Sequence, residues 1–563
     1  MYFSAGDGPF YFAETIRNLG WLPVIWRADE GFGANHGFRL WYDYALQLVI
    51  KILSSLGMSW WWIDKLLWVG AGAVAVYGSY TLGKYFFKKP YVYFVPVIYA
   101  VNSYVLLLFA GGQLGVLWAY AYIPLVLIAC IRAIDDHRGF SLSHAVRRGL
   151  SLALLAALDL RFAYLLMGAL ALYHLFYRLK HGIKGFWMSM LDVGVSLLVT
   201  VGIHAFWILP GVLAGGGSAG LDNELTNPGM LRFLSFADFS HAISLLHPNW
   251  PENLFGKIYF LQPEFLALPF LAFSSLLFIK PKTDNRKQIT FFALVALLGA
   301  FLAKGVNEPF GGIFQWMFTH VPGFVMFRDP TKFYVFIAIS YSVLIPFTLN
   351  HLAKRIISKK SFIIYHSPFI IFGVFWLFTI RALFVGDVRG NFRPMQLPEE
   401  YVQLKNLFVA DPIPSRTLWI PQREKFAYTS DVHPLLYADQ LFPGASVSAV
   451  IALAETPDFM TMLAAAGVGY IVVPQDTQQR LFLNDYRYDS KERDALIAAL
   501  KKTPLVQNSA FDRVAVFENH EFTFASELPT SLGRQQRFTN IGLTISILSL
   551  ATSVGVLAFQ RRK

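Results

Sequence analysis

The chain has 563 residues, of which 55% are hydrophobic, 16% aromatic and only 15% charged. Soluble domains are typically about 25% charged, so this composition excludes a disordered chain, a coiled coil and an ordinary cytosolic enzyme. It predicts an all-α polytopic membrane protein. The formal net charge of +12 would suggest a nucleic-acid partner for a soluble protein. In a membrane protein the excess is expected in cytoplasmic loops, so we expect no nucleic acid.

The first 60 residues form a polar, glycine-rich segment, read here as the first extracytoplasmic loop. Glycines flank Asp7 on both sides, which permits a tight turn and leaves the carboxylate accessible as a general base or a ligand of Mg or Mn. The alternative is an ordinary turn aspartate. Asp29 and Glu30 are a second candidate pair for substrate contacts, although most such clusters are only solvated.

The apolar stretch 44–57 is short and contains Lys51, so we expect a helix lying on the outer membrane interface. The chain begins outside with no preceding span, and we therefore expect a first helix to be missing from this sequence.

A helix needs about 20 mostly apolar residues to cross the hydrocarbon core. About eleven stretches are candidates for such spans: 61–83, 91–109, 114–131, 149–160, 162–178, 187–211, 264–280, 288–303, 331–352, 361–384 and 538–559. The first ten belong to a transmembrane core over 61–384, and the last belongs to a C-terminal part, 538–563, with a basic tail.

Lys and Arg residues alternate strongly between successive connections. Every second connection and the C-terminal tail are basic and together hold 21 Lys and Arg residues, whereas the intervening connections hold five. The basic side is therefore cytoplasmic. This predicts a multi-pass protein of the cell membrane with a cytoplasmic C-terminus and with the loops 212–263 and 304–330 outside.

The stretch 149–160 is too short to span the membrane alone, because about eleven residues rise only ~16 Å. A hairpin of this stretch with 162–178 would place Asp159 and Arg161 below the outer surface, where ionisable residues usually line a watery cavity. One long helix, or a salt bridge with no wider role, are the alternatives.

Loop 212–263 contains a Pro-Asn-Trp-Pro run after a histidine. His247, Asn249 and Trp250 are candidate contacts to a sugar-like ligand, because amides and aromatic faces bind carbohydrate. The same residues also form interfacial belts.

Loop 304–330 ends at Arg328, and Lys332 follows at the start of a span, against the positive-inside trend. Arg binds phosphate bidentately, Lys adds a point charge, and a helix N-terminus favours an anion. These residues are candidates for binding a phosphate. An Arg328–Asp329 contact without a ligand is the alternative.

Segment 385–537 has near-normal polarity and predicts a small extracytoplasmic α/β domain. Strands are expected at 416–420, 468–473 and 513–517, and helices near 398–409, 456–466 and 490–502. No nucleotide loop, nucleophile elbow or metal spacing occurs in it.

Several motifs together resemble the GT-C membrane glycosyltransferases, and more narrowly YfhO-like proteins and the membrane part of AftD-type arabinofuranosyltransferases. They are Gly6-Asp7-Gly8-Pro9, Gly111-Gly112-Gln113, Trp118-Ala119-Tyr120-Ala121-Tyr122-Ile123-Pro124-Leu125, Phe327-Arg328-Asp329-Pro330-Thr331-Lys332, Ala466-Gly467-Val468-Gly469-Tyr470-Ile471-Val472-Val473 and Phe517-Glu518-Asn519.

The resemblance implies transfer of a sugar from a polyprenyl-phosphate donor to a glycan, lipid or protein acceptor of the cell envelope on the outer face. It implies that Asp7 acts as base or metal ligand and that Arg328 and Lys332 hold the donor phosphate. The sugar, linkage and acceptor stay undetermined.

Two other classes of function are retained. A transporter or lipid flippase would use Asp192 and His204 in the 187–211 span, but no repeat relates the two halves of the chain. A non-catalytic envelope assembly protein would use only the outer domain.

Overall fold

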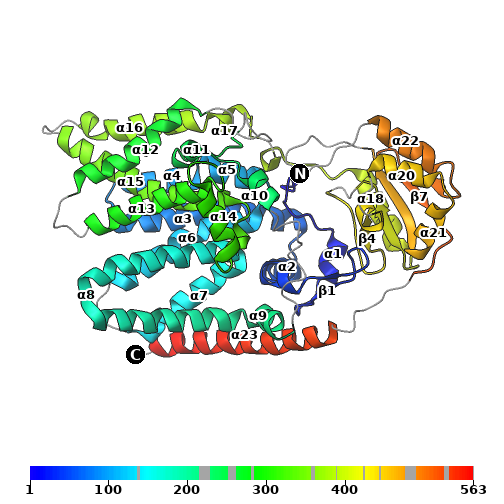
Figure 1. The fold of residues 1–563 in the computed structure, drawn as a ribbon, viewed down its shortest axis with the longest axis horizontal. Helices are drawn as coiled ribbons and strands as arrows, with labels where there is room; N and C mark the ends of the chain where they lie inside the picture. Colours follow the sequence, from blue (N-terminus) through cyan, green and yellow to red (C-terminus); the bar gives the residue numbers. More distant parts are fainter. Residues whose placement is uncertain are drawn as a thin grey trace. The chain divides into compact units, whose positions relative to one another are not determined.

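Figure 1 shows the computed structural model. It describes residues 1–561 except 136–139, 215–227, 251–260, 280–284, 357–361, 389, 422–424, 443–445, 476–489 and 525–531. Contacts divide the chain into two compact units. Unit 1 comprises Met1–Asp64, Leu209–Gly220 and Arg393–Ile541, and unit 2 comprises Lys65–Ile208, Leu221–Phe392 and Gly542–Lys563.

Unit 2 is helical. Its helices include α3 (Trp60–Phe86), α4 (Phe94–Ala100), α5 (Ser103–Ala110), α6 (Leu114–Asp135), α7 (Leu142–Leu158), α8 (Leu160–Ile203), α9 (Ala205–Leu213), α12 (Ala267–Phe273), α13 (Asn285–Ala303), α14 (Gly311–His320), α15 (Tyr334–Ile356) and α16 (Phe362–Thr379). Further elements are α10 (Pro228–Leu234), α11 (Phe239–Ile243), α17 (Arg381–Val385) and the 3-10 turns η2 (Tyr91–Tyr93), η5 (Pro263–Leu266), η6 (Ser274–Phe278), η7 (Phe324–Phe327), η8 (Pro330–Phe333) and η9 (Gly390–Phe392). Helix α23 (Leu532–Arg561) enters this unit at Gly542.

Five helices in the described part of the chain are long and apolar enough to cross a membrane, or up to eight if each of three bent helix pairs is one span. This supports a multi-pass membrane protein. The expected number of eleven spans stays a prediction. One of the three pairs, Val447–Ala454 with Asp458–Ala465, packs against the sheet of unit 1.

Helix α15 is the centre of unit 2. Its residues from Tyr334 to Leu349 are buried, and it packs against α4, α12 and α13. By contrast, most side chains of α23 face outward, including the apolar Ile547 and Leu548. Apolar side chains on the outside of such a helix are what a lipid environment requires, because lipid tails and Leu are equally apolar.

The short helix of the predicted hairpin ends at Asp159, whose extended backbone separates α7 from α8 and excludes one continuous helix. Helix α8 then doubles back on itself (Figure 1). Its second half runs parallel to α7, because hydrogen bonds join Ser196 to Ala145, Thr200 to Gly149 and His204 to Ala153 at a constant separation of 51 residues. This agrees with the predicted direction of both segments.

The carboxylate of Asp135 joins four helix ends that were predicted on one side of the membrane. It accepts hydrogen bonds from Tyr85 at 2.8 Å, from Tyr173 at 3.0 Å and from Gln288 at 3.3 Å. These residues lie on α3, α6, the first half of α8 and α13. The contacts support the prediction that these four helix ends lie on the same side of the membrane. That this side is cytoplasmic stays a prediction.

Unit 1 contains a five-stranded sheet. Its strands are β3 (Arg416–Trp419), β4 (Leu435–Tyr437), β5 (Val468–Pro474), β6 (Val506–Asn508) and β7 (Val514–Glu518), in the order β4-β3-β5-β7-β6. Strands β4, β3 and β5 are parallel, with Leu418 opposite Leu436 and Ile471, and β7 is antiparallel to both β5 and β6.

Different elements pack against the two faces of this sheet. One face packs on α19 (Ala438–Leu441), α20 (Val447–Ala454), α21 (Asp458–Ala465) and α22 (Ser490–Leu500). The other packs on α18 (Glu399–Ala410) and on Phe10 and Phe12 from the first loop. The first loop also forms α1 (Ala13–Asn18), β1 (Trp26–Arg27), β2 (Ala34–Asn35), η1 (Gly37–Arg39) and α2 (Leu40–Ser55).

The predicted α/β character of 385–537 is confirmed, and its three predicted strands and three predicted helices are present. Strands β4 and β6 were not predicted, because three residues are too few to show an alternating pattern. Its extracytoplasmic location stays a prediction.

Candidate functional site

Asp159 and Arg161 form a partly buried ion pair at the start of α8. The guanidinium donates to both carboxylate oxygens, from Nε to Oδ1 at 3.0 Å and from Nη2 to Oδ2 at 2.6 Å. Asp159 also caps the helix, since its Oδ1 accepts from the backbone N–H of Arg161 at 2.9 Å. The pair is thus formed by residues two apart, and Asp159 is only 2% exposed.

Asp329 and Lys332 repeat this arrangement at the start of η8 and α15. Lys332 Nζ donates to Asp329 Oδ2 at 2.7 Å and to Gln113 Oε1 at 3.1 Å. Asp329 Oδ1 accepts from the backbone N–H and the hydroxyl of Thr331. The Lys332 side chain is 3% exposed. A lysine at the entry of an apolar helix is therefore held inside unit 2 and not in solvent.

Aromatic rings line the same cluster. Tyr104 stacks on Tyr334 with ring centroids 5.5 Å apart and on His247 at 5.9 Å. The Tyr104 hydroxyl has no hydrogen-bond partner among the described residues, although the side chain is 1% exposed. Asp329, Arg161 and Asp159 all interact electrostatically with it. The two ion pairs therefore share one site, and a buried hydroxyl without a partner faces it.

The charge states of two residues follow from this environment. Burial lowers the pKa of His247 to about 3, so its ring is neutral and Nδ1 accepts from the Asn249 N–H at 3.1 Å. Burial alone would raise the pKa of Asp329, but the Lys332 ammonium and the bonds from Thr331 hold it well below its usual range. The site thus combines two carboxylates and two cations with a neutral imidazole.

The remaining candidates of the outer loops lie as follows. Trp250 is buried and packs edge-on against Phe265, with centroids 6.5 Å apart. Asn249 is half-buried, and its Oδ1 has no partner among the described residues. Arg328 is half-buried beside Asp329 in the sequence. None of their predicted roles is tested by these positions.

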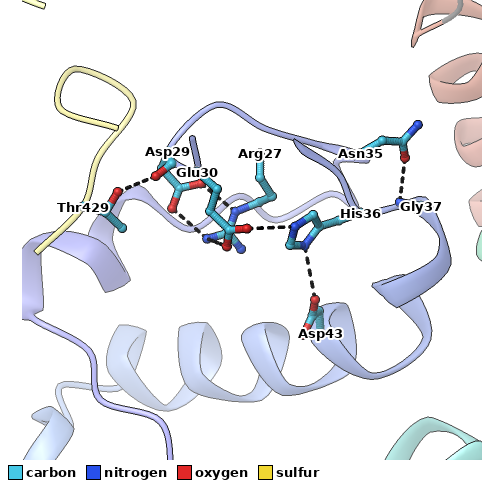
Figure 2. A network of polar contacts seen from close by, with 8 residues as sticks. All are labelled: Arg27, Asp29, Glu30, Asn35, His36, Gly37, Asp43 and Thr429. Carbon is cyan, nitrogen blue, oxygen red and sulfur yellow. Dashed lines mark hydrogen bonds and ion pairs between the residues drawn. The ribbon is translucent and has the colours of Figure 1, made fainter. Parts of the chain in front are cut away.

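Unit 1 has its own network of charged side chains, built around a small β-hairpin (Figure 2). Arg27 on β1 donates to both oxygens of Asp29, each at 2.7 Å. His36 Nε2 lies 3.0 Å from Glu30 Oε2, and its Nδ1 lies 3.6 Å from Asp43 Oδ2 on α2. Asp29 and Glu30, the predicted pair, are therefore both engaged in ion pairs.

This network faces strand β4. Glu30 forms a parallel bridge with Leu435, the Gly31 N–H donates to the Leu435 carbonyl at 2.6 Å, and the Thr429 hydroxyl donates to the Asp29 carbonyl. Burial lowers the pKa of His36, but the carboxylates of Asp43 and Glu30 outweigh it and raise that pKa to about 9. His36 is therefore a charged imidazolium at pH 7, and its contacts with Glu30 and Asp43 link the hairpin to α2.

Asp7 is exposed on a turn formed by Gly6 and Asp7 in unit 1. Among the described residues, no group of three or more His, Cys, Asp and Glu side chains could hold a metal ion. The described residues therefore do not present a formed cation site, and the divalent cation stays a prediction.

Sequence reasoning missed Gln113, Tyr104, Arg27 and Asp43 as members of these clusters. Gln113 is distant in the sequence from Lys332, and Tyr104 and Asp43 lie in runs of apolar residues, whereas Arg27 is only two residues from its partner Asp29. Gln113 alone carried a signal, since it follows two glycines and precedes a span.

The predicted resemblance to AftD-type arabinofuranosyltransferases is confirmed at the level of the fold. The chain resembles arabinofuranosyltransferase AftD from mycobacteria, at a TM-score of 0.58 and 12% identity, over 90% of this chain and 37% of that chain. A mutant of that protein matches at a TM-score of 0.57 and 13% identity, over 88% and 38% of the two chains. This chain thus spans less than two fifths of the length of these structures.

At such identities the likeness concerns the fold alone. Comparison with protein-family models gave no match, and comparison with curated proteins gave none either.

Proposed function

We propose that the protein is an integral-membrane glycosyltransferase that uses a polyprenyl-phosphate-linked sugar donor. The acceptor is a glycan, lipid or protein of the cell envelope, and the reaction takes place on the extracytoplasmic face. The observation that carries the proposal is the two ion pairs, Asp159–Arg161 and Asp329–Lys332, in each of which one side chain is only 3% exposed among apolar helices. Ionisable residues within membrane helices are costly, and they usually mark a functional site.

The cationic side chains suit the donor phosphate. Lys332 and Arg161 stand at helix starts, where backbone N–H groups add a partial positive charge that favours an anion. Arg328 would complete the phosphate contacts. As the bond from the sugar to the phosphate breaks, negative charge grows on the departing oxygen, and fixed cations in a site of low polarity stabilise it.

Asp7 would act as the general base. The acceptor hydroxyl gives its proton to the Asp7 carboxylate while its oxygen forms the new bond to the anomeric carbon. The polyprenyl phosphate leaves with the electron pair of the broken bond. The exposed position of Asp7 on its turn supports this role, because a base must be open to the acceptor.

The test uses purified protein in lipid vesicles and a panel of polyprenyl-phosphate-linked pentoses and hexoses with radiolabelled sugar. We expect transfer by the wild type and a loss of about 10²- to 10⁴-fold for Asp7→Asn, the range typical of a lost general base. Asp439→Asn, at another exposed carboxylate of unit 1, is the matched control and should retain transfer. Full transfer by Asp7→Asn would rule out its role as base.

A lipid flippase is the second candidate, because Met190–Ile203 and Ala205–Leu213 form a helix pair bent by 81° and broken helices occur in transporters. The two ionisable residues of this pair make contacts within the helices of unit 2. Asp192 pairs with Arg148, and His204 contacts the Ala153 carbonyl at 2.9 Å. Movement of a fluorescent polyprenyl lipid across the vesicle membrane, without sugar transfer, would favour this alternative.

A further inference from the structure

The turn that carries Asp7 is unusually constrained. Gly6 has a φ of +56°, in the left-handed region, and the Gly8 N–H donates to the Ala5 carbonyl at 3.0 Å. A Cβ atom on Gly8 would lie 2.9 Å from the Phe3 carbonyl oxygen. Larger residues are therefore excluded on both sides of Asp7 by conformation or by space.

One side chain from the α/β domain reaches this turn. Lys425 Nζ donates to the carbonyl of Gly6 and to the carbonyl of Gly8, the latter at 2.8 Å. These are the carbonyls of the two residues that flank Asp7. A single ammonium with bonds to both holds the Gly6–Asp7 and Gly8–Pro9 peptide groups, so it restrains the backbone before and after the Asp7–Gly8 step.

The segments that flank the turn are anchored independently of Lys425. Tyr2 and Met395 exchange backbone hydrogen bonds of 2.8 and 2.9 Å, and the Phe3 N–H donates to the Asp64 carboxylate at 2.8 Å. On the other side, Phe10 packs edge-on against Phe426, with centroids 4.8 Å apart. Loss of Lys425 would thus remove the contact of the α/β domain with the turn while the rest of the N-terminal segment stays docked.

We propose that Lys425 is a positioning residue that holds the Asp7 carboxylate in its reactive orientation. The proposal rests on the proposed function, and it assigns the α/β domain a part in presenting the base. A misplacement of about 1 Å at a reacting group can cost about 10²-fold in rate. The competing explanation is that Lys425 only helps to dock the first loop onto the α/β domain.

A second lysine makes this distinction testable. Lys405 on α18 contacts Glu14 on α1 at 2.9 Å, and it also joins the N-terminal segment to the α/β domain. It does so away from the turn. Lys405→Met is therefore a control that removes another lysine contact between the N-terminal segment and the α/β domain, here an ion pair.

The experiment compares the full-length wild type, Lys425→Met, Lys425→Arg and Lys405→Met in the vesicle assay with the labelled donor. We expect Lys425→Met to lower kcat by about 10- to 100-fold with KM within about twofold, since misorientation acts on the chemical step. Lys425→Arg should recover most of kcat, and Lys405→Met should stay within about threefold of the wild type. Equal losses in the two Met variants, or no loss in Lys425→Met, would overturn the proposal.

Hydrogen exchange of residues 1–12 provides a readout that does not depend on activity. Faster exchange at Gly8 in Lys425→Met than in Lys405→Met is expected. If the wild type transfers no sugar, the proposed function fails. Equal hydrogen exchange in both variants would separately overturn the role of Lys425 as a positioning residue. If Lys425→Met fails to fold, Lys425→Arg and Lys425→Gln in the same measurements decide the outcome.

Discussion

The charged clusters of the two units differ in how they meet water, although both consist of ion pairs between near neighbours in the sequence. In unit 2, the side chains of Lys332 and Asp159 are each only 3% exposed, whereas their partners Asp329 and Arg161 are 24% and 28% exposed. In unit 1, Glu30 and Asp43 keep 38% and 26% of their side-chain surface exposed. A buried ion pair contributes little net stability, whereas breaking it is costly. The cluster of unit 2 is therefore better suited to a ligand, and that of unit 1 to holding a hairpin against a sheet.

The largest effect is expected from breaking the enclosed pair. Lys332→Met leaves the Asp329 carboxylate, which is 24% exposed, without its cation, and this should lower the free energy of unfolding by about 3 kcal/mol, the low end for a buried pair. Thermal unfolding in detergent, followed by tryptophan fluorescence, measures this change. The exposed pair Lys502–Glu455 is the control, and Lys502→Met should cost about 0–1 kcal/mol.

A double variant separates stability from function at the same pair. Lys332→Met combined with Asp329→Leu removes both charges, and it should regain most of the lost stability but not the sugar transfer. Recovered transfer in the double variant would show that the pair serves folding alone.

The network of unit 1 should make stability depend on pH in the alkaline range. The pKa of His36 is raised in the folded protein from its usual 6.5 to about 9, so its contribution is fully present below pH 6.5 and is lost as pH rises through 9. The loss should be about 1–3 kcal/mol, because the partner carboxylates are partly exposed. Unfolding measured at several values between pH 6 and 10 tests this.

His36→Gln provides the comparison for that titration, because an amide can donate a hydrogen bond but does not change its charge. The wild type should lose stability relative to the variant between pH 6.5 and 9. Parallel stability curves would contradict a charged His36 in this network.

The smallest change in stability is expected from removing the buried hydroxyl of Tyr104. Tyr104→Phe removes a group without a partner among the described residues, so stability should stay the same or rise by about 1 kcal/mol. Transfer should fall if the hydroxyl contacts substrate. Tyr120→Phe is the matched control, since the Tyr120 hydroxyl donates to the Tyr99 carbonyl at 2.6 Å and should cost about 1 kcal/mol. Equal destabilisation by both variants would show that Tyr104 is already satisfied within the protein.

Hydrophobic runs, basic loops and short local patterns were sufficient to predict much of this protein. Long apolar stretches identify membrane helices because the bilayer imposes their length, and the constant offset between α7 and α8 agrees with the predicted alternation. The ion pairs Asp159–Arg161 and Asp329–Lys332 were also within reach of sequence reasoning, because residues two or three apart at a helix start lie close together.

Only the tertiary structure decided which of these local features meet. It brings Gln113 to Lys332 across 219 residues and Lys425 to the Asp7 turn across more than 400. It also places Phe12 of the first loop in the core of the α/β sheet. A sequence pattern records the preferences of neighbouring residues, whereas contacts between distant segments depend on how whole helices and strands pack. The long-range partners of the charged residues that the sequence analysis selected, such as Gln113 for Lys332, are therefore known only from the fold.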